Sequence, residues 1–553
     1  MPRPPPPPLL VVVLVSICIP SLKVIAPLHR RWLPVLPSFA HYDPNVVVDV
    51  EDTTVAHTGL GDLRGTTEGG VRVWRGVPYA QQPLGERRFL APSPARPWTG
   101  VRDAVEHGPL PPQGKSFVGG GRDDPKVRHE ACLTLTVWSP DTSGSLPVMV
   151  WIPGGAFVFG AGQFQLYNGS RLAANGNVVV VNVTYRIGVF GGLELSALGD
   201  GFDDNLALRD QIAALRWVRE NIGAFGGNPD RVTVFGESAG ATSVLALLAS
   251  PAADGLFSRA IAQSPALPLI ADREIRARRA HEFLHQLGVN ASDAAAIKAI
   301  KTLPQRQLRH AAGQLQLRSA AVSPTLAYGL TFGVDLVPNH PVDAARAGAL
   351  MKKVPLIVGT NSHEASMFAW SKPPMLPTTP ATIDAYLDRV APDRKERMLA
   401  AYPHYPRRRA LIAFGSDVMF GAPTWAFADA YSAYAPTYVY RFDHVGLSLR
   451  ALGLGATHGS EIVHVQHSYG SYLGRLLHPL GRRVQPSVGR RMQRTWLDFA
   501  TEGWESGEIH WSNGHDWPIY DTARRTTRVI LSTRDMVIED PDRARRLAWS
   551  GLY

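Results

Sequence analysis

Residues 231–241, RVTVFGESAGA, constrain the fold of this chain more than any other segment. A β-branched run, residues 232–234, is followed by Gly-Glu-Ser-Ala-Gly and then by an alanine- and leucine-rich stretch, residues 241–250. This order predicts a strand, a sharp turn and a helix, with Ser238 at the turn. The flanking glycines fit because a side chain there would collide with the neighbouring strand or helix. Ser238 is therefore a candidate nucleophile, and the simpler alternative is a serine that only caps a helix.

Apolar runs elsewhere in the chain predict a large sheet. Residues 148–152 and 178–183 are largely apolar, as expected of strands that are covered on both faces. In residues 206–221 the apolar positions lie near helical spacing. The other expected elements are strands at residues 71–75, 133–138, 355–359 and 437–442 and a helix at residues 272–287. Strands that alternate with helices predict an α/β fold with a mostly parallel central sheet flanked by helices.

The N-terminal leader and two insertions interrupt this regular pattern. The leader, residues 1–45, begins with MPRPPPPP, which can form neither a helix nor a strand ladder. Its residues 9–19 are apolar but too few to span a membrane. The leader could be a poor signal peptide, a membrane-associating segment or sequence upstream of the native protein. We expect the globular domain at residues 46–553, with insertions at residues 291–347 and 373–413 above the C-terminal edge of the sheet.

The composition of the chain bears on its partners and its compartment. The formal net charge is +10, but the basic residues are scattered and no basic run is interleaved with aromatic residues, so nucleic acid is not an expected partner. Cys18 lies in the apolar leader and Cys132 in an expected strand, which argues against a structural disulfide. This slightly favours a cytoplasmic location. Membrane association would involve only residues 9–19, and the oligomeric state is left open.

A serine nucleophile requires a base that takes its proton and an acid that orients the base. In sheets that carry this serine turn, the acid and then the histidine follow the serine along the chain. Glu364 lies in a polar loop just after the apolar residues 354–359, where a carboxylate is well placed to reach the site. His458 lies in a glycine-bracketed loop after the last expected strand, with His464 and His467 as near neighbours. The simpler interpretation of each is a solvated or core residue.

Hydrogen-bond donors for an oxyanion are expected after the strand at residues 148–152. Residues 151–157, WIPGGAF, combine the end of that strand with a turn of small residues, which let backbone N–H groups approach a ligand closely. Pro153 has no N–H, so the useful donors lie beyond it. The simpler alternative is an ordinary turn after a strand.

Several ordered blocks of the sequence resemble one known family. These blocks are RGVPYA at residues 75–80, CLTLTVW at 132–138, WIPGGAFVFG at 151–160, VNVTYRIGVFG at 181–191, the long run at 208–241 and WPIY at 517–520. The chain resembles the type-B carboxylesterases, the cholinesterase-like branch of the α/β-hydrolases, in a bacterial form. The resemblance implies an α/β-hydrolase fold with long insertions over the active site. It also implies hydrolysis of carboxylic esters through an acyl-enzyme intermediate, and a closing strand near residues 517–520.

The same resemblance assigns roles to individual positions. Ser238 would be the nucleophile, Glu364 the acid and His458 the general base. The other implied positions are the oxyanion-hole residues Gly155, Ala156 and Ala239 and two supporting residues, Glu237 near the histidine and Ser264 in a second layer. Neither a metal nor another cofactor is implied, and the expected partner is a small-molecule ester.

The chain departs from the family pattern at several places. Ala156 replaces the third glycine, which leaves an N–H in place, and the residues around Glu364 read His-Glu-Ala instead of the common Asp-Glu-Gly. Cys132 matches the second cysteine of the family's first disulfide, but Pro111 stands at the partner position, so Cys132 is expected to be free. Phe117 is the only Phe, Tyr or Trp between them, so the tryptophan that binds choline in cholinesterases is absent. Short- to medium-chain carboxylic esters are the expected substrates.

Two alternative functions compete with an esterase. Residues 281–285, HEFLH, match a zinc-protease motif, with His281, Glu282 and His285 as its working residues. The third histidine of a metzincin is replaced by Ala291, so an ordinary amphipathic helix is favoured. Relatives that act as weakly catalytic binding proteins usually lack a triad residue. All three are present here, which favours an enzyme.

Overall fold

The computed structural model describes residues 54–114, 128–322, 326–350, 353–371, 374–479, 487–503, 511–512 and 517–553. The expected leader at residues 1–45, its apolar residues 9–19 and Phe117 lie outside the described residues.

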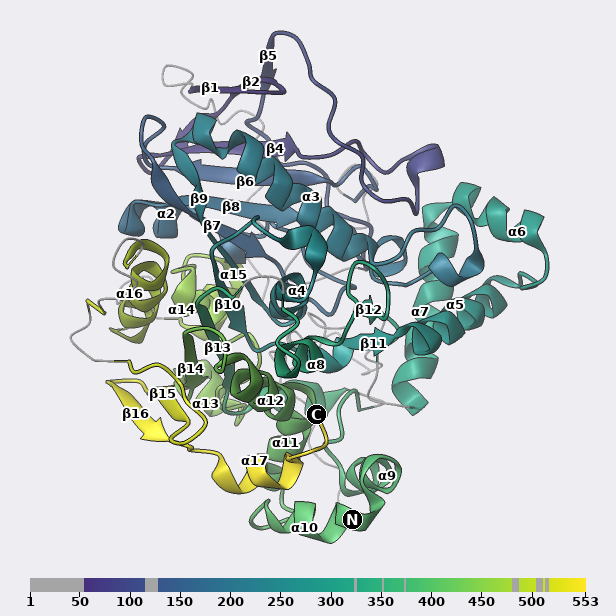
Figure 1. Cartoon of the computed structure of the whole chain (residues 1–553), viewed down its shortest axis with the longest axis vertical. Helices are drawn as coiled ribbons and strands as arrows, with labels where there is room; N and C mark the ends of the chain where they lie inside the picture. Colours follow the sequence, from purple (N-terminus) through teal and green to yellow (C-terminus); the bar gives the residue numbers. More distant parts are fainter. Residues whose placement is uncertain are drawn as a thin grey trace, which may run out of the picture.

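An 11-stranded sheet forms the centre of the molecule (Figure 1). Its strands lie in the order β16, β15, β14, β13, β10, β9, β7, β8, β6, β4, β3. From β15 to β8 neighbouring strands are parallel, and the strands added at both ends are antiparallel. The bounds are β3 (Thr66–Glu68), β4 (Val71–Pro78), β6 (Thr134–Ser139), β7 (Leu146–Ile152), β8 (Val179–Thr184), β9 (Gly227–Glu237), β10 (Arg259–Gln263), β13 (Leu356–Asn361), β14 (Thr437–Phe442), β15 (Thr526–Ile530) and β16 (Asp535–Glu539). The predicted α/β fold with a mostly parallel centre is confirmed.

Two short sheets accompany the central one. β1 (Val55–Thr58), β2 (Gly61–Arg64) and β5 (Val101–Asp103) form the first, and β11 (Ile270–Asp272) and β12 (Leu330–Phe332) form the second. The helices are α2 (Ser170–Gly176), α3 (Leu206–Asn221), α4 (Ala239–Leu248), α5 (Arg273–Leu287), α6 (Ala294–Ala299), α7 (Gln305–Val322), α8 (Pro341–Arg346), α9 (Pro380–Val390), α10 (Lys395–Ala400), α11 (Arg408–Ser416), α12 (Ala422–Tyr431), α13 (Leu447–Ala451), α14 (Ile462–Val465), α15 (Tyr472–Leu477), α16 (Ser487–Thr501) and α17 (Arg543–Trp549).

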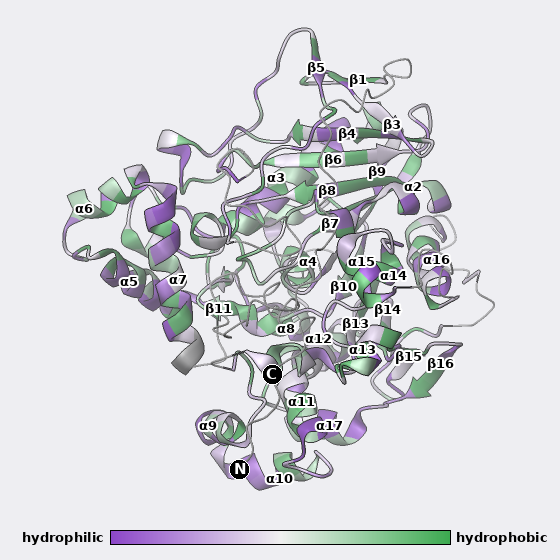
Figure 2. Cartoon of the chain, turned by 180° about the vertical axis from the view of Figure 1, so that it is seen from behind, coloured by the Kyte–Doolittle hydropathy of each residue, from purple (hydrophilic) through white to green (hydrophobic). Residues whose placement is uncertain are grey.

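Each face of the sheet has its own hydrophobic core. Alternate residues of a strand point to opposite faces, and in β7 Val148, Val150 and Ile152 join one core while Met149 and Trp151 join the other. Helices α3 and α4 pack on the first face, and α2 and α16 pack on the second. In Figure 2 the central strands are largely hydrophobic, whereas α5 and α7 carry hydrophilic residues at the periphery. Burial on both faces explains why the central strands are apolar along their whole length.

Most of the predicted elements are present, and one expectation is wrong. The helix at residues 206–221 begins and ends as predicted, and the segment 291–347 forms α6, α7, β12 and α8. The closing strand expected near residues 517–520 does not form there, and β15 and β16 close the sheet instead. Pro518 lacks the N–H that a strand ladder needs, and only the Tyr520 N–H donates to the Thr437 carbonyl, over 2.7 Å.

In the described part of the chain, one helical run is long and apolar enough to cross a membrane. It extends over Arg408–Tyr431, through α11 and α12. In its most apolar 18-residue window, 78% of the residues are buried inside the protein. This burial identifies the run as a helix of the protein core.

Candidate active site

Ser238 occupies the turn between β9 and α4, as the sequence predicted. Its backbone has φ 58° and ψ −122°, a region that residues other than glycine rarely adopt. The turn is fixed on both sides, because the Ser238 N–H donates to the Gln263 carbonyl over 2.8 Å and the Ser238 carbonyl accepts from the Thr242 N–H over 2.8 Å. The residue is 7% exposed. Within the described residues its hydroxyl makes no hydrogen bond, so it is free to contact a ligand.

The glycines around Ser238 are required by close packing. A Cβ at Gly240 would lie 2.0 Å from the Ile152 carbonyl oxygen, and one at Gly236 would lie 2.7 Å from the same atom. A Cβ at Gly154 would lie 2.4 Å from the Glu237 carbonyl oxygen. All three distances are shorter than the contacts that Cβ atoms make in proteins, so a side chain does not fit at any of these positions. The predicted reason for glycine on both sides of the serine is thus confirmed, and the WIPGGAF loop packs directly on the serine turn.

Glu364 and His458 meet across the ends of neighbouring strands. Glu364 follows β13 and His458 follows β14, and these two strands pair in parallel. His458 Nδ1 lies 2.6 Å from Glu364 Oε2, and the Asn361 N–H donates to Glu364 Oε1 over 2.7 Å. Phe420 packs on the imidazole with its ring centroid 4.5 Å away. A carboxylate at Nδ1 fixes the proton on that nitrogen and leaves Nε2 as an acceptor.

Glu237 lies on the other side of the same imidazole. Its Oε1 is 3.2 Å from His458 Nε2, and both side chains are 6% exposed. Burial raises the pKa of Glu237 well above its usual range. Burial alone would lower the pKa of His458, but the carboxylates of Glu237 and Glu364 outweigh it and raise the pKa to about 9. The expectation that Glu237 sits near the histidine agrees with this geometry.

Three backbone N–H groups near Ser238 make no hydrogen bond within the described residues. They belong to Gly155, Ala156 and Ala239. Gly155, Ala156 and Phe157 have φ of 114°, 54° and 58°, so three successive residues lie in the left-handed region. A Cβ at Gly155 would lie 2.1 Å from the Phe159 carbonyl oxygen, so only glycine fits there. Ala239 is the first residue of α4, whose N-terminal N–H groups have no partner within the helix. The positions predicted for an oxyanion hole therefore carry free donors.

A mostly apolar cavity opens above these residues. Ser238, Glu237, His458, Gly155 and Ala156 all line it. Its space, including the opening to solvent, is about 1020 Å³. The apolar lining includes Leu166, Leu269, Leu326, Met367, Phe368, Met375, Leu376, Met419, Phe420, Leu473 and Leu477. Leu326, Met375 and Leu376 belong to segments predicted as insertions over the sheet edge.

A buried polar network behind the site was not predicted. Asn361 Nδ2 donates to Glu461 Oε2 over 2.5 Å, and Gln263 Nε2 donates to Glu461 Oε1 over 3.2 Å. Trp496 Nε1 in turn donates to Gln263 Oε1 over 3.0 Å. Burial, and then the charge of Glu364, raises the pKa of Glu461. Glu461 lies three residues after His458 in a loop of small residues, but nothing in the sequence pointed to its partners Asn361 and Gln263.

The remaining candidates lie away from the cavity. Ser264 ends up buried after β10, and its hydroxyl has no partner among the described residues. His281, Glu282 and His285 are exposed on α5, and Glu282 pairs with Arg279 at 2.7 Å. No third metal-ligating side chain among the described residues joins them. This geometry is that of an ordinary amphipathic helix. Cys132 is buried and free, as expected.

The sequence and the structure are both similar to those of known carboxylesterases. A model of the carboxylesterase family matches residues 52–547 of the chain. The chain is 38% identical over 496 residues to the para-nitrobenzyl esterase of Bacillus subtilis, across 89% of this chain and 97% of the relative. A solved structure of PNB esterase matches with a TM-score of 0.80 at 35% identity, over 90% of this chain and 99% of that one. A Geobacillus stearothermophilus carboxylesterase matches with a TM-score of 0.77 at 33% identity, over 90% and 100%.

Proposed function

The chain belongs to the carboxylesterase family and is a carboxylic ester hydrolase, and from that premise we propose that Ser238, His458 and Glu364 carry out the reaction. The observation that supports this most strongly is the convergence of three separate segments on one cavity. Ser238 and His458 both line the cavity, and Glu364 holds His458 from behind over 2.6 Å. The proposed catalytic unit is residues 46–553, of which the family match covers all but the ends.

In the proposed first half-reaction, Ser238 Oγ attacks the carbonyl carbon of the ester and His458 Nε2 takes the hydroxyl proton. The carbonyl electron pair moves to oxygen and a tetrahedral intermediate forms. The bond to the alcohol oxygen then breaks, and His458 gives its proton to that oxygen. The products are the free alcohol and an acyl ester on Ser238. The Ser238–His458 hydrogen bond, which is not made in the substrate-free protein, would form when substrate binds.

In the proposed second half-reaction, water takes the place of the alcohol. Its proton goes to His458 Nε2 while its oxygen attacks the acyl carbon. The intermediate collapses, Ser238 Oγ recovers the proton from His458, and the carboxylic acid leaves. Glu364 keeps the imidazole in the required tautomer and stabilises the imidazolium that forms twice per turnover.

The N–H groups of Gly155, Ala156 and Ala239 are the proposed donors to the oxyanion. They are fixed before substrate binds and have no competing acceptor within the described residues. Donors that need no reorganisation stabilise the charge that develops in the transition state, and one such donor is worth about 10²- to 10³-fold in kcat. The strained backbone of residues 155–157 supports this role, because strain of this kind collects where a site must be preorganised.

The cavity supports neutral esters with short- to medium-chain acyl groups as substrates. Its lining is apolar apart from Glu237, His458 and a few hydroxyl groups, so a charged acyl or alcohol group would lose hydration without gaining a partner. Its space of about 1020 Å³ exceeds what an acetyl group needs. Small-molecule esters are the proposed partners, without nucleic acid and with membrane contact only through residues 9–19.

Turnover of p-nitrophenyl esters of increasing acyl length tests this proposal. Ser238→Ala should lower kcat by at least about 10⁴-fold with the fold retained by circular dichroism. Ser250→Ala is the matched control, because this buried serine lies just beyond the far end of α4, away from the cavity. A p-nitrobenzyl ester is a second substrate, since a Bacillus relative is named for it. Wild-type turnover by folded Ser238→Ala would overturn the assignment.

A further inference from the structure

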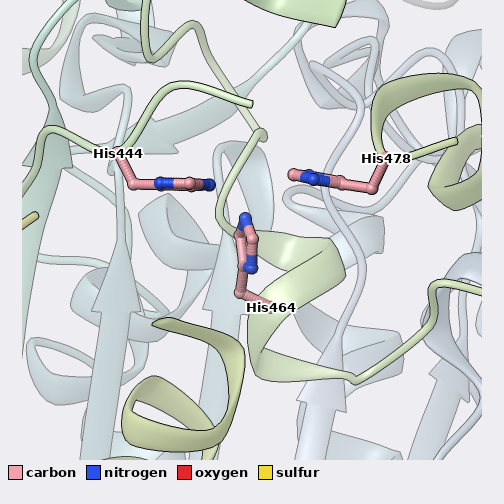
Figure 3. Close-up of side chains that lie close together, drawn as sticks. All are labelled: His444, His464 and His478. Atoms are coloured by element: carbon pink, nitrogen blue, oxygen red, sulfur yellow. The ribbon is translucent and has the colours of Figure 1, made fainter. Parts of the chain in front are cut away.

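Three histidines come together behind the wall of the cavity, apart from the proposed reaction (Figure 3). His444 lies in the loop after β14, His464 lies in α14, and His478 caps the C-terminus of α15. One ring nitrogen from each lies within 4.8 Å of the others. Figure 3 shows the three side chains directed from three separate segments toward a common point. Nothing in the ester hydrolysis proposed above uses them.

Some ring nitrogens of the three histidines make hydrogen bonds, and others have no partner in the described part of the chain. His464 Nδ1 lies 2.7 Å from the Tyr469 hydroxyl, and His444 Nδ1 lies 2.8 Å from the Ser532 hydroxyl. His444 Nε2 and His478 Nε2 are buried and have no partner in the described part of the chain. A buried nitrogen without a partner is costly. Two such atoms within one histidine cluster indicate that a ligand belongs there.

The planes of the three rings lie at different angles, and those of His444 and His478 are nearly parallel, at 11°. Burial, reinforced by His478, lowers the pKa of His444 to about 4, and burial lowers that of His478 to about 4. The planes of His444 and His464 cross at 84°, and those of His464 and His478 cross at 77°. Two arginines, Arg491 and Arg450, act electrostatically on the cluster, and Arg491 pairs with Asp535 at 3.2 Å.

We propose that His444, His464 and His478 bind one borderline transition-metal ion, with Zn²⁺ as the best match. Imidazole nitrogens suit zinc, copper and nickel, whereas calcium and magnesium prefer oxygen ligands. Three histidines and a solvent ligand complete a tetrahedral zinc shell. Nitrogens bound to one tetrahedral zinc ion lie about 3.3 Å apart. The ligand nitrogens here lie within 4.8 Å of one another, so the three rings would move slightly closer together on binding. Outer hydrogen bonds from Nδ1 to Tyr469 and Ser532 are of the kind that orients metal-bound histidines.

The ion would brace the substrate cavity. Ile462 of α14 and Leu473 and Leu477 of α15 line the cavity. Two of the three histidines belong to, or directly follow, these helices. An ion bound by them would therefore tie this wall to β14 of the central sheet. Metal binding is measured without substrate, so its failure would leave the proposed ester hydrolysis untouched.

Titration of the chelator-treated, full-length protein with Zn²⁺ tests the site. We expect saturation at about one ion per chain and, at free Zn²⁺ near one hundred times Kd, a rise in Tm of about 2 °C. Co²⁺ in place of Zn²⁺ should give the intense visible absorption of a four-coordinate ion. His444→Gln and His478→Gln should each weaken Zn²⁺ binding by more than about tenfold, since even outer partners of metal ligands contribute about 10- to 100-fold.

The matched control is the histidine pair on α5. His281 and His285 are exposed one turn apart, a spacing that collects metal ions weakly on any helix surface. The double variant His281→Gln/His285→Gln should leave stoichiometry and affinity unchanged. Two results would overturn the proposal. One is the absence of saturable binding, and the other is binding that is lost in the α5 variant but kept in both His444→Gln and His478→Gln.

Discussion

Glu237 is the residue whose influence on the reaction can be argued most directly from its contacts. It lies 3.2 Å from His458 Nε2, the nitrogen that must accept the Ser238 proton in the proposed mechanism. A carboxylate there stabilises the protonated imidazole, which is why the pKa of His458 is raised. The effect has two sides. It assists the transition state, in which His458 carries the proton, and it lowers the fraction of active, neutral His458 in the resting enzyme.

Glu237→Gln should therefore change the pH profile in a defined direction. The neutral form of His458 increases as pH rises through its pKa, so the acid limb of kcat/KM reports that pKa. Removing the charge should move this limb to lower pH by about one unit or more, and should lower the plateau reached at high pH. The measurement is kcat/KM for a p-nitrophenyl ester against pH. Glu220→Gln, at an exposed position of α3, is the control, and an acid limb that stays in place in Glu237→Gln would contradict the account.

At the scale of elements, the turn between β9 and α4 depends on backbone contacts that exclude any side chain. A Cβ at Gly240 would lie 2.0 Å from the Ile152 carbonyl oxygen at the end of β7. Neither partner can move, because β7 and β9 are paired in the centre of the sheet. The strained conformation of Ser238 therefore persists because α4 is held against β7.

Gly240→Ala should destabilise the protein and remove its activity together. Overpacking against backbone costs about 3 kcal/mol of unfolding free energy, and the displaced helix would carry the Ala239 N–H with it. Denaturant unfolding and ester turnover measure the two effects. Gly223→Ala is a suitable comparison, since a Cβ there meets nothing within 4 Å. If Gly240→Ala were as stable and active as Gly223→Ala, the packing argument would fail.

Features of the structure that depend on residues close in sequence could be predicted, whereas features that depend on contacts between distant residues could not. The serine turn and the helix at residues 206–221 were predictable because adjacent residues determine them. Glu364 and His458 could be placed because both follow strands whose ends share one sheet edge. The Asn361–Glu461 hydrogen bond joins residues 100 positions apart and has no local signal. The histidine cluster likewise depends on how three separate segments come together, and no spacing in the sequence indicates that.

At the scale of the whole molecule, a buried ion pair connects three segments that are far apart in sequence. The guanidinium of Arg186, just after β8, makes two hydrogen bonds to Asp210 of α3, over 2.8 and 2.6 Å, and the Arg186 backbone N–H makes a third over 3.0 Å. A further Arg186 N–H donates to the Leu90 carbonyl over 2.8 Å. The side chains are 2% and 0% exposed. Each charge therefore relies on the other, because neither can be hydrated in place.

Asp210→Asn should be among the most destabilising conservative substitutions in this chain. It leaves the Arg186 guanidinium buried without a counter-charge, which costs about 3–5 kcal/mol. Urea unfolding followed by tryptophan fluorescence gives the change in free energy. Asp230→Asn removes the acid of an exposed pair with Arg219, whose side chains are 47% and 75% exposed. That variant should match the wild type, and equal stability of the two variants would refute the role of the buried pair.

Covalent labelling tests the central claim most directly. A serine-directed phosphonate, added in slight excess, should inactivate the enzyme and add one phosphonyl group per chain. Mass spectrometry of the digested protein should place that group on the peptide that contains Ser238, and Ser238→Ala should remain unlabelled. Inactivation with the label on another residue, or full activity after stoichiometric labelling of Ser238, would contradict the assignment of Ser238 as the nucleophile.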